Sequence, residues 1–126
     1  LIEALDVERI AIGRKLDITI LPDPEMGMRQ GYMLQNNYGS GYRTAPGFLG
    51  IGAQQQLDHR YLHEDVGYGL VFMSGLGRQV GVATPAMDAV IEVASIVMAR
   101  SYREEALRTP ETLGIAQRSL DELGAL

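Results

Sequence analysis

The stretch TPAMDAVIEVASIVMARSY, residues 84–102, carries the strongest secondary-structure signal in the chain and decides its fold class. Thr84 is a favoured N-cap residue, and Pro85 suits the first helical position because its missing N–H has no helical partner there. Apolar residues then cover most of the circumference: Met87, Val90, Ile91, Ala94, Ile96, Val97 and Met98. We therefore expect a helix at the centre of the hydrophobic core.

The chain before this stretch is also helical in pattern. Residues 68–81, YGLVFMSGLGRQVG, are mostly apolar and predict a buried helix. Residues 1–16 predict another helix, because apolar residues recur on one side: Ile2, Leu5, Ile10, Ile12 and Leu16. Between them we expect a turn at residues 21–28, a weaker helix from Met28 to Tyr38 and a glycine-rich loop at residues 39–54.

The C-terminal side repeats these signals on a smaller scale. RTPETLGI, residues 108–115, offers Thr109 as a cap and Pro110 as a first-turn residue. SLDELGAL, residues 119–126, contains the capping-box pair Ser119 and Glu122 and a terminating Gly124. Since strand-like alternation is nowhere convincing, the sequence predicts an all-α fold.

Composition sets the broad class of the protein. The 126 residues are 46% hydrophobic and 21% charged, which predicts one globular domain over residues 1–126. A net charge of −5 with scattered basic residues argues against nucleic-acid binding. We expect no membrane partner, since no apolar run reaches about 18 residues and no signal peptide is evident. The absence of cysteine fits a cytoplasmic location, and the start at Leu1 suggests truncation at the N-terminus.

Titratable residues concentrate in DHRYLHED, residues 58–65. His59 and His63 have the spacing of a helical zinc site, but Arg60 stands where zincins carry glutamate, and its charge disfavours a nearby dication. As a solvated helix face, the segment would hold only an Arg60–Glu64 ion pair worth about 0.3–0.5 kcal/mol. Two features argue against a simple solvated face: apolar residues interleave with the charges, so no side is purely polar, and glycines follow at once, which lets the backbone bend.

The glycines of GLGRQVG, residues 75–81, loosely resemble a dinucleotide-binding loop. That fingerprint requires a preceding strand and an acid about 20 residues further on. Here the preceding residues look helical, and Asp88 lies just inside another helix. Close helix packing explains these glycines better, so no nucleotide-binding domain is predicted within the chain.

Three segments in order give the chain a family resemblance: HRYLHEDVGYGLV (59–71), GVATPAMDAVIEVAS (81–95) and RTPETLGI (108–115). Together they resemble the C-terminal helical domain of the opine (octopine/nopaline) dehydrogenases. There the matching text runs approximately R-Y-x-x-E-D-V-P-Y-G-L, then G-V-x-T-P-x-x-D-x-x-I, then G-R-T-x-x-x-L-G. The likeness spans most of the chain, and it departs at Gly67, where proline is usual, and at His63, where threonine is frequent.

The resemblance implies a helical substrate domain of the 6-phosphogluconate dehydrogenase C-terminal-like type. Family members join it to an N-terminal Rossmann domain, absent from this chain, that binds NAD or NADP. They reductively condense an amino acid with a 2-oxo acid. Asp65 matches the catalytic aspartate, and Arg60 matches an arginine that holds a substrate carboxylate. The catalytic histidine would lie upstream of Leu1, so the chain alone should be inactive.

The chemistry of these residue types suits the implied roles. A guanidinium recognises carboxylates through two parallel hydrogen bonds, and a carboxylate fixes the tautomer of a proton-donating histidine. His63, Glu64 and Tyr68 are candidates for lesser roles. Arg60 and Asp65 lie about 140° apart on an ideal α-helix. If both face one pocket, residues 60–69 must be irregular or lie at a helix end, and we expect that.

Two other interpretations stay open. The chain can be the helical domain of another Rossmann-paired dehydrogenase, acting on a different 2-oxo or 2-hydroxy acid. It can also be a non-catalytic self-association module, in which the charged cluster forms an interface rim. We expect some exposed apolar surface and a homodimer formed through it.

Overall fold

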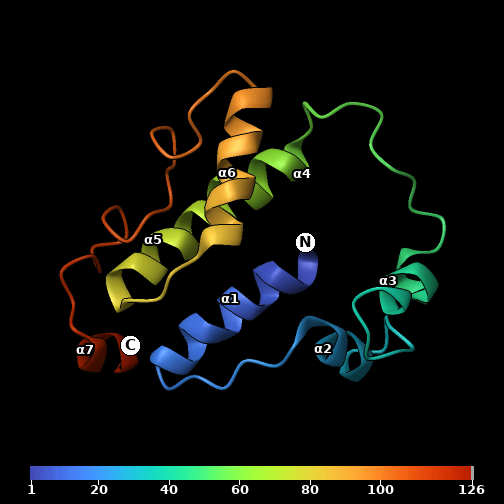
Figure 1. Ribbon diagram of the computed structural model, residues 1–126, viewed down its shortest axis with the longest axis horizontal. Coiled ribbons are helices and arrows are strands. Elements are labelled where there is room, and N and C mark those ends of the chain that lie inside the picture. The colour runs from blue at the N-terminus through green and yellow to red at the C-terminus, as the bar shows by residue number, and fades with distance from the viewer. Residues whose placement is uncertain (126) are drawn as a thin grey trace.

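The computed structural model describes residues 1–125, which form helices and connecting segments without a β-strand (Figure 1). The elements in chain order are α1 (Ile2–Lys15), α2 (Asp23–Arg29), α3 (Ser40–Thr44), the 3-10 helix η1 (Pro46–Phe48), α4 (Arg60–His63), the π-helix η2 (Glu64–Leu70), α5 (Val71–Val80), α6 (Pro85–Val97) and α7 (Leu120–Gly124). The predicted all-α fold is confirmed. Leu126, the last residue of the predicted domain, lies outside the described residues. No helix within the described part is long and apolar enough to cross a membrane.

Helices α1, α5 and α6 pack against one another and enclose the core (Figure 1). One buried cluster joins the π-helix to α5, α6 and the segment after α6: Val66, Val71, Ile91, Ala94 and Tyr102. A second cluster joins the three helices: Ile12, Val80 and Met87. Close approach depends on Gly77, where a Cβ would lie 2.8 Å from Thr84 Cγ2. The helices predicted around residues 1–16, 68–81 and 84–102 are therefore confirmed as core elements.

The N-terminus of α6 is capped by a carboxylate from α1. Glu8, which is 8% exposed, accepts hydrogen bonds from the Ala86 N–H at 2.6 Å and the Met87 N–H at 2.9 Å. Thr84 occupies the N-cap position, but its side chain makes no capping bond, and its Oγ1 has no partner among the described residues. The predicted N-cap position of Thr84 and first-turn position of Pro85 are therefore confirmed, but the Thr84 side chain does not supply the capping bond. Glu8 accepts from the Ala86 and Met87 N–H groups, which have no partner within the helix, and places a negative charge at the positive end of the helix dipole.

Replacing Glu8 with Ala should lower the free energy of unfolding by about 2 kcal/mol, because two buried N–H groups lose a charged acceptor. Urea denaturation followed by circular dichroism measures the change. Glu3→Ala is the matched control, since Glu3 is exposed in the first turn of the same helix. Equal losses in the two variants would show that Glu8 contributes nothing through the cap.

Only one side of α6 is covered. Met87 and Ile91 are buried, whereas the opposite side exposes Val93, Ile96 and Val97, at 61%, 70% and 55%. The prediction of a helix at the centre of the core is therefore correct for one face and wrong for the other. The apolar pattern covers nearly the whole circumference, but α1 and α5 pack against only part of it.

The region between α1 and α4 differs most from the prediction. The expected turn at residues 21–28 contains α2, because Pro24 falls in the first helical turn, where a missing N–H costs nothing. The expected helix from Met28 to Tyr38 is absent from the described chain, which turns instead. Gly31 has a φ of +84°, a left-handed conformation that ends the helical path. The glycine-rich loop holds α3 and η1 and is otherwise irregular.

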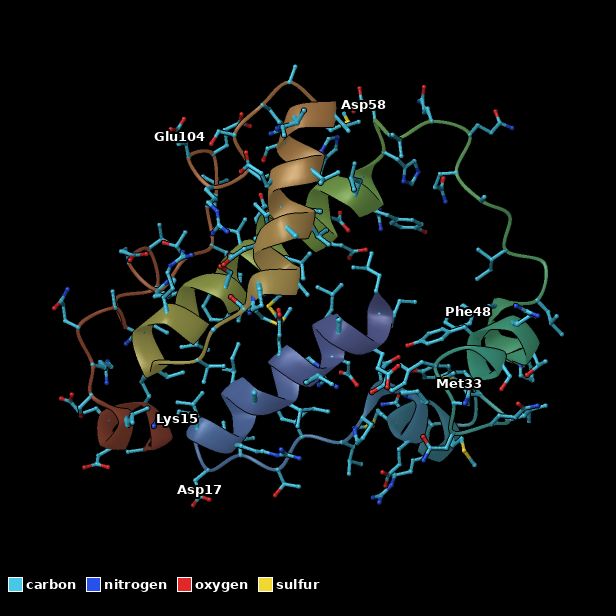
Figure 2. All side chains as sticks on the ribbon, viewed as in Figure 1. Lys15, Asp17, Met33, Phe48, Asp58 and Glu104 are labelled. Atoms are coloured by element: carbon cyan, nitrogen blue, oxygen red, sulfur yellow. The ribbon has the colours of Figure 1, made fainter. Side chains whose placement is uncertain are left out.

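A buried carboxylate ties this region to α1. Asp6, 5% exposed, accepts hydrogen bonds from the Asp23 N–H at 2.7 Å, the Tyr38 hydroxyl at 2.6 Å and Arg9 Nε at 2.7 Å. The Tyr42 hydroxyl donates in turn to Asp23. Met33 and Phe48, labelled in Figure 2, lie in the small unit held in this way.

The segment after α6 runs along α5 as a series of turns and ends in α7 (Figure 1). Thr109 caps a single turn, since its Oγ1 accepts from the Thr112 N–H at 3.2 Å. The predicted capping box is confirmed, because Ser119 Oγ accepts from the Glu122 N–H and Glu122 accepts from the Ser119 N–H. Leu123 of α7 packs against the second core cluster, which fixes the end of this segment against the core.

Candidate functional site

Residues 60–70 form an irregular start to the long helical run that continues into α5. His59 caps α4, its Nδ1 accepting from the Tyr61 N–H at 3.2 Å. From Glu64 to Leu70 the backbone is a π-helix. Such i→i+5 segments are rare and occur frequently at functional sites. The prediction that residues 60–69 are irregular or lie at a helix end is confirmed by this π-helix.

Arg60 and Asp65 both lie exposed on this segment. The Arg60 side chain is 74% exposed, and its Nε lies 3.4 Å from a carboxylate oxygen of Glu64. In the described chain no hydrogen bond or ion pair joins Arg60 to Asp65, and neither lines the cavity described below. The wider π turn brings positions five apart nearer to one side than an α-helix does. The assignment of a shared role to these two residues therefore stays a prediction.

His63 is the centre of the charged cluster. Its Nε2 lies 2.9 Å from Asp58 Oδ1, and its Nδ1 lies 2.6 Å from the Tyr102 hydroxyl. Tyr102 is 2% exposed, and this burial raises the pKa of its phenol, so the hydroxyl stays protonated at neutral pH. A neutral His63 satisfies both contacts when Nε2–H donates to Asp58 and Nδ1 accepts from Tyr102. Arg100 Nη1 also approaches Nδ1, at 3.3 Å.

A cavity of about 210 Å³ opens beside this cluster. His63, Gly67 and Tyr68 line it from the irregular helix, and Arg100, Tyr102 and Glu105 line it from the segment after α6. Arg100 pairs with Glu105 and stacks over the Tyr102 ring, 4.9 Å from its centroid. Figure 2 shows Asp58 and Glu104 on either side of the C-terminal end of α6, where the two segments meet. Among the charged cluster and its neighbours, His63 and Tyr68 face the cavity, and Arg60 and Asp65 do not line it.

Tyr102, Arg100 and Glu105 were not predicted from the sequence. His63 Nδ1 meets Tyr102 and Arg100 across separations of 39 and 37 residues, and no local spacing encodes such contacts. The one available signal was a run of charged residues directly after the strongest helix. Among the expected lesser residues, His63 and Tyr68 line the cavity, and Glu64 pairs with Arg60.

Two other motifs have structural explanations. Gly75 and Gly77 lie inside α5, and Gly81 ends it with a φ of +75°. No strand precedes them in the described residues, so they do not form a dinucleotide-binding loop. Within residues 1–125, no group of three or more His, Asp or Glu side chains is arranged to hold a metal ion.

Comparison with known proteins identifies relatives of this chain. The family model for the "NAD/NADP octopine/nopaline dehydrogenase, alpha-helical domain" matches residues 1–98. An opine dehydrogenase of Arthrobacter sp. (strain 1C) is 36% identical over 123 residues, covering 92% of this chain and 32% of the relative. The protein ocs of Agrobacterium tumefaciens (strain Ach5) is 30% identical over 97 residues, covering 77% of this chain and 27% of the relative. The chain therefore spans about a third or less of the length of these curated relatives.

Proposed function

Because the chain belongs to the octopine/nopaline dehydrogenase family through its alpha-helical domain, we propose that it acts as the substrate domain of an NAD(P)-dependent enzyme. The proposed reaction is the reductive condensation of an amino acid with a 2-oxo acid. The family match over residues 1–98 carries this proposal, since it includes the charged cluster, α5 and α6. The likeness to a protein named opine dehydrogenase supports it.

In this proposal Arg60 binds a substrate carboxylate. Its guanidinium is exposed, and its present partner Glu64 is also 54% exposed. An exposed ion pair of this kind contributes only about 0–1 kcal/mol, so a substrate carboxylate can displace Glu64 at little cost. The fork of N–H donors then fixes the orientation of the carboxylate.

Asp65 is proposed to accept the ring N–H of a catalytic histidine that lies outside this chain. Reduction of an imine carbon builds negative charge on nitrogen, and a protonated histidine can supply the proton. A carboxylate on the other ring nitrogen fixes the tautomer and stabilises the imidazolium. The exposure of Asp65 supports this role, because its carboxylate is open to a partner from another part of the enzyme.

The nicotinamide cofactor does not fit the described residues of this chain. Gly75 and Gly77 lie inside α5 and allow close packing there, Gly81 ends that helix, and no strand–loop–helix unit cradles a pyrophosphate among residues 1–125. We propose that a Rossmann domain outside these 126 residues binds NAD or NADP. The contribution of this chain is confined to the substrates.

The proposal is tested by comparing the chain alone with a chimera in which it replaces the matched segment of the Arthrobacter opine dehydrogenase. Oxidation of NADH or NADPH is followed with a panel of amino acids and 2-oxo acids. The chimera should turn over both substrates together, and the chain alone should not. Turnover by the isolated chain would contradict the division of labour, and reduction of the 2-oxo acid without an amino acid would favour the 2-hydroxy acid alternative.

Replacing Arg60 with Lys in the chimera should raise the KM for the carboxylate substrate about 10-fold or more, because the bidentate contact becomes a single point charge. The KM for NAD(P)H should be unchanged. Arg43→Lys on α3 is the control, since Arg43 is exposed in a different part of the fold. Equal effects on the two KM values would exclude a substrate-specific role for Arg60.

We also propose self-association, because one observation favours it. A groove of about 390 Å³ is lined by apolar residues of α6 together with Leu1, Leu57 and Leu62. Its lining includes Val93 and Val97, which are exposed at 61% and 55%. Apolar surface of this kind marks an interface.

Replacing Val93, which lines the groove, with Asp should shift a dimer towards monomer in sedimentation velocity, because a charge would enter the apolar contact. The matched control is Ile18→Asp. Ile18 is 51% exposed and follows the C-terminal end of α1, whereas Leu1, at the N-terminal end, lines the groove. A chain that is monomeric at all concentrations, or a dimer that neither substitution changes, would exclude this face as the interface.

A further inference from the structure

The exposed carboxylate of Asp65 is positioned by its backbone alone. In the described chain it forms no hydrogen bond or ion pair, unlike His63 two positions before it and Glu64 beside it. A catalytic group without contacts of its own depends on the residues that hold its backbone in place. The groups that hold the π-helix η2 therefore determine where the Asp65 carboxylate lies.

Tyr102 contacts this segment on both sides of Asp65. Two positions before Asp65, the Tyr102 hydroxyl lies 2.6 Å from His63 Nδ1. Two positions after Asp65, a Cβ on Gly67 would lie 3.4 Å from Tyr102 Cδ1, so the ring packs directly against the backbone there. Val66, between these points, shares a buried cluster with Tyr102. One side chain thus spans the turn that carries Asp65.

Tyr102 is itself held in place. It is 2% exposed, and its backbone N–H donates to Ser95 Oγ of α6 at 3.3 Å. The Arg100 guanidinium lies over the ring, 4.9 Å from its centroid, and pairs with Glu105. The support that Tyr102 gives to the π-helix therefore originates in α6 and the segment that follows it.

The two contacts of Tyr102 favour a π-helical backbone over an α-helical one. A single π turn contains one residue more than an α turn, which rotates the residues before it by about 100° relative to α5. His63 lies before this turn, and Gly67 lies within it. In a regular α-helix His63 would turn away from Tyr102 while Gly67 stayed against the ring. The hydrogen bond to His63 and the π turn therefore stabilise each other.

We propose that Tyr102 is a positioning residue for Asp65. Its hydroxyl bond to His63 and its ring contact at Gly67 hold the π-helix in the form that presents the Asp65 carboxylate to the catalytic histidine. This inference rests on the role of Asp65 in the proposed function, and Tyr102 acts through Asp65 without touching a reacting atom. Tyr102 lies beyond residues 1–98, so the match to the family model does not include it.

The first test is a double-mutant cycle in the chimera. Tyr102→Phe keeps the buried ring and removes the hydroxyl, so it should lower kcat about 10-fold and leave the KM for NAD(P)H unchanged. In a chimera that already carries Asp65→Asn, it should lower kcat by no more than about 2-fold, because the two residues act as a unit. Tyr61→Phe is the matched control, since Tyr61 lies in the same cluster and is 50% exposed.

The cycle separates failure of this inference from failure of the proposed function. A large loss of kcat in Asp65→Asn without a loss in Tyr102→Phe would overturn the positioning role alone. The same loss from Tyr102→Phe with and without Asp65→Asn would also overturn it, since Tyr102 would then act by another route. An unchanged kcat in Asp65→Asn would contradict the proposed function, and the inference would fall with it.

Substitutions at His63 test the other end of the hydrogen bond. In His63→Asn the side-chain oxygen can stand where Nδ1 stands and accept from Tyr102, whereas His63→Leu offers no acceptor. The Asn variant should keep most of the parent kcat, and the Leu variant should lose about as much as Tyr102→Phe. Equal losses in the two His63 variants would show that His63 does not act as the acceptor for Tyr102.

Hydrogen exchange in the 126-residue chain gives a measurement that does not depend on catalysis. The Val71 N–H donates to the Val66 carbonyl in the i→i+5 pattern, so its exchange rate reports on the π turn. This amide should exchange about 10-fold faster in Tyr102→Phe than in the parent, and at the parent rate in Tyr61→Phe. An unchanged rate in Tyr102→Phe would overturn the proposal, because the hydroxyl bond would not be holding the turn.

Discussion

Asp65→Asn in the chimera is expected to lower kcat by about 10²–10⁴-fold, the range associated with loss of positioned acid–base chemistry. An amide has no charge to stabilise an imidazolium, and it can present its N–H instead of an acceptor to the histidine ring. Binding of the carboxylate substrate should change little, because that role is the one proposed for Arg60. Steady-state kinetics with NAD(P)H, an amino acid and a 2-oxo acid measure both quantities.

Glu64→Gln is the matched control for this experiment, because Glu64 is the adjacent acid and is also exposed. It should reduce kcat by no more than about 3-fold, since its ion pair with Arg60 contributes only a few tenths of a kcal/mol. Both variants should unfold at the same urea concentration as the parent. Similar losses of kcat in the two variants would argue for a general effect of negative charge and against a specific role for Asp65.

The sequence predicts the elements whose signals are local. Helix α6 begins at Pro85 as expected, and the apolar spacing of residues 1–16 gives α1 almost to the residue. The capping box of α7 is equally local, since Ser119 and Glu122 are three residues apart. In each case the deciding interactions lie within a few positions, so the pattern contains the necessary information.

Contacts between distant residues account for what the sequence did not predict. The cap of α6 comes from Glu8, which lies 78 positions before Ala86. The exposed face of α6 looks as apolar in sequence as its buried face, because the pattern records hydrophobicity but not which neighbours are present. The misassigned helix after Met28 fails for a conformational reason, since Gly31 adopts a left-handed φ.

In the candidate site, too, local features could be predicted from the sequence and contacts between distant residues could not. Its segment and its irregular backbone could be inferred from HRYLHEDVGYGLV, because those residues are contiguous. The family could be inferred from that stretch together with residues 81–95 and 108–115. The cavity beside it needs Arg100, Tyr102 and Glu105, which only the folded chain brings to His63. Within the cluster, His63 and Tyr68 line the cavity, whereas Arg60 is exposed to solvent and does not.

The second large effect concerns the buried carboxylate that holds the region from α2 to η1. Asp6→Asn should lower the free energy of unfolding by about 3 kcal/mol at pH 7, because hydrogen bonds from Arg9, Tyr38 and the Asp23 N–H lose a charged acceptor in a buried position. One amide hydrogen of the new side chain would also face these donors. Tyr38→Phe, which removes a single bond to the same group, should cost about 1 kcal/mol.

The pH dependence of stability distinguishes loss of charge from a change of shape. Burial acts to raise the pKa of Asp6, but hydrogen bonds from Tyr38, Asp23 and Arg9 and the charge of Arg9 outweigh it and hold the pKa below 3.8. A group whose pKa is lower in the folded state stabilises the fold above its unfolded pKa and loses that contribution as pH falls through its folded pKa. The difference in stability between parent and Asp6→Asn should therefore be constant from pH 7 to about 5 and shrink below about pH 4. Urea denaturation across this range measures it, and a difference that is the same at low and neutral pH would show that the ionised carboxylate does not hold this region to α1.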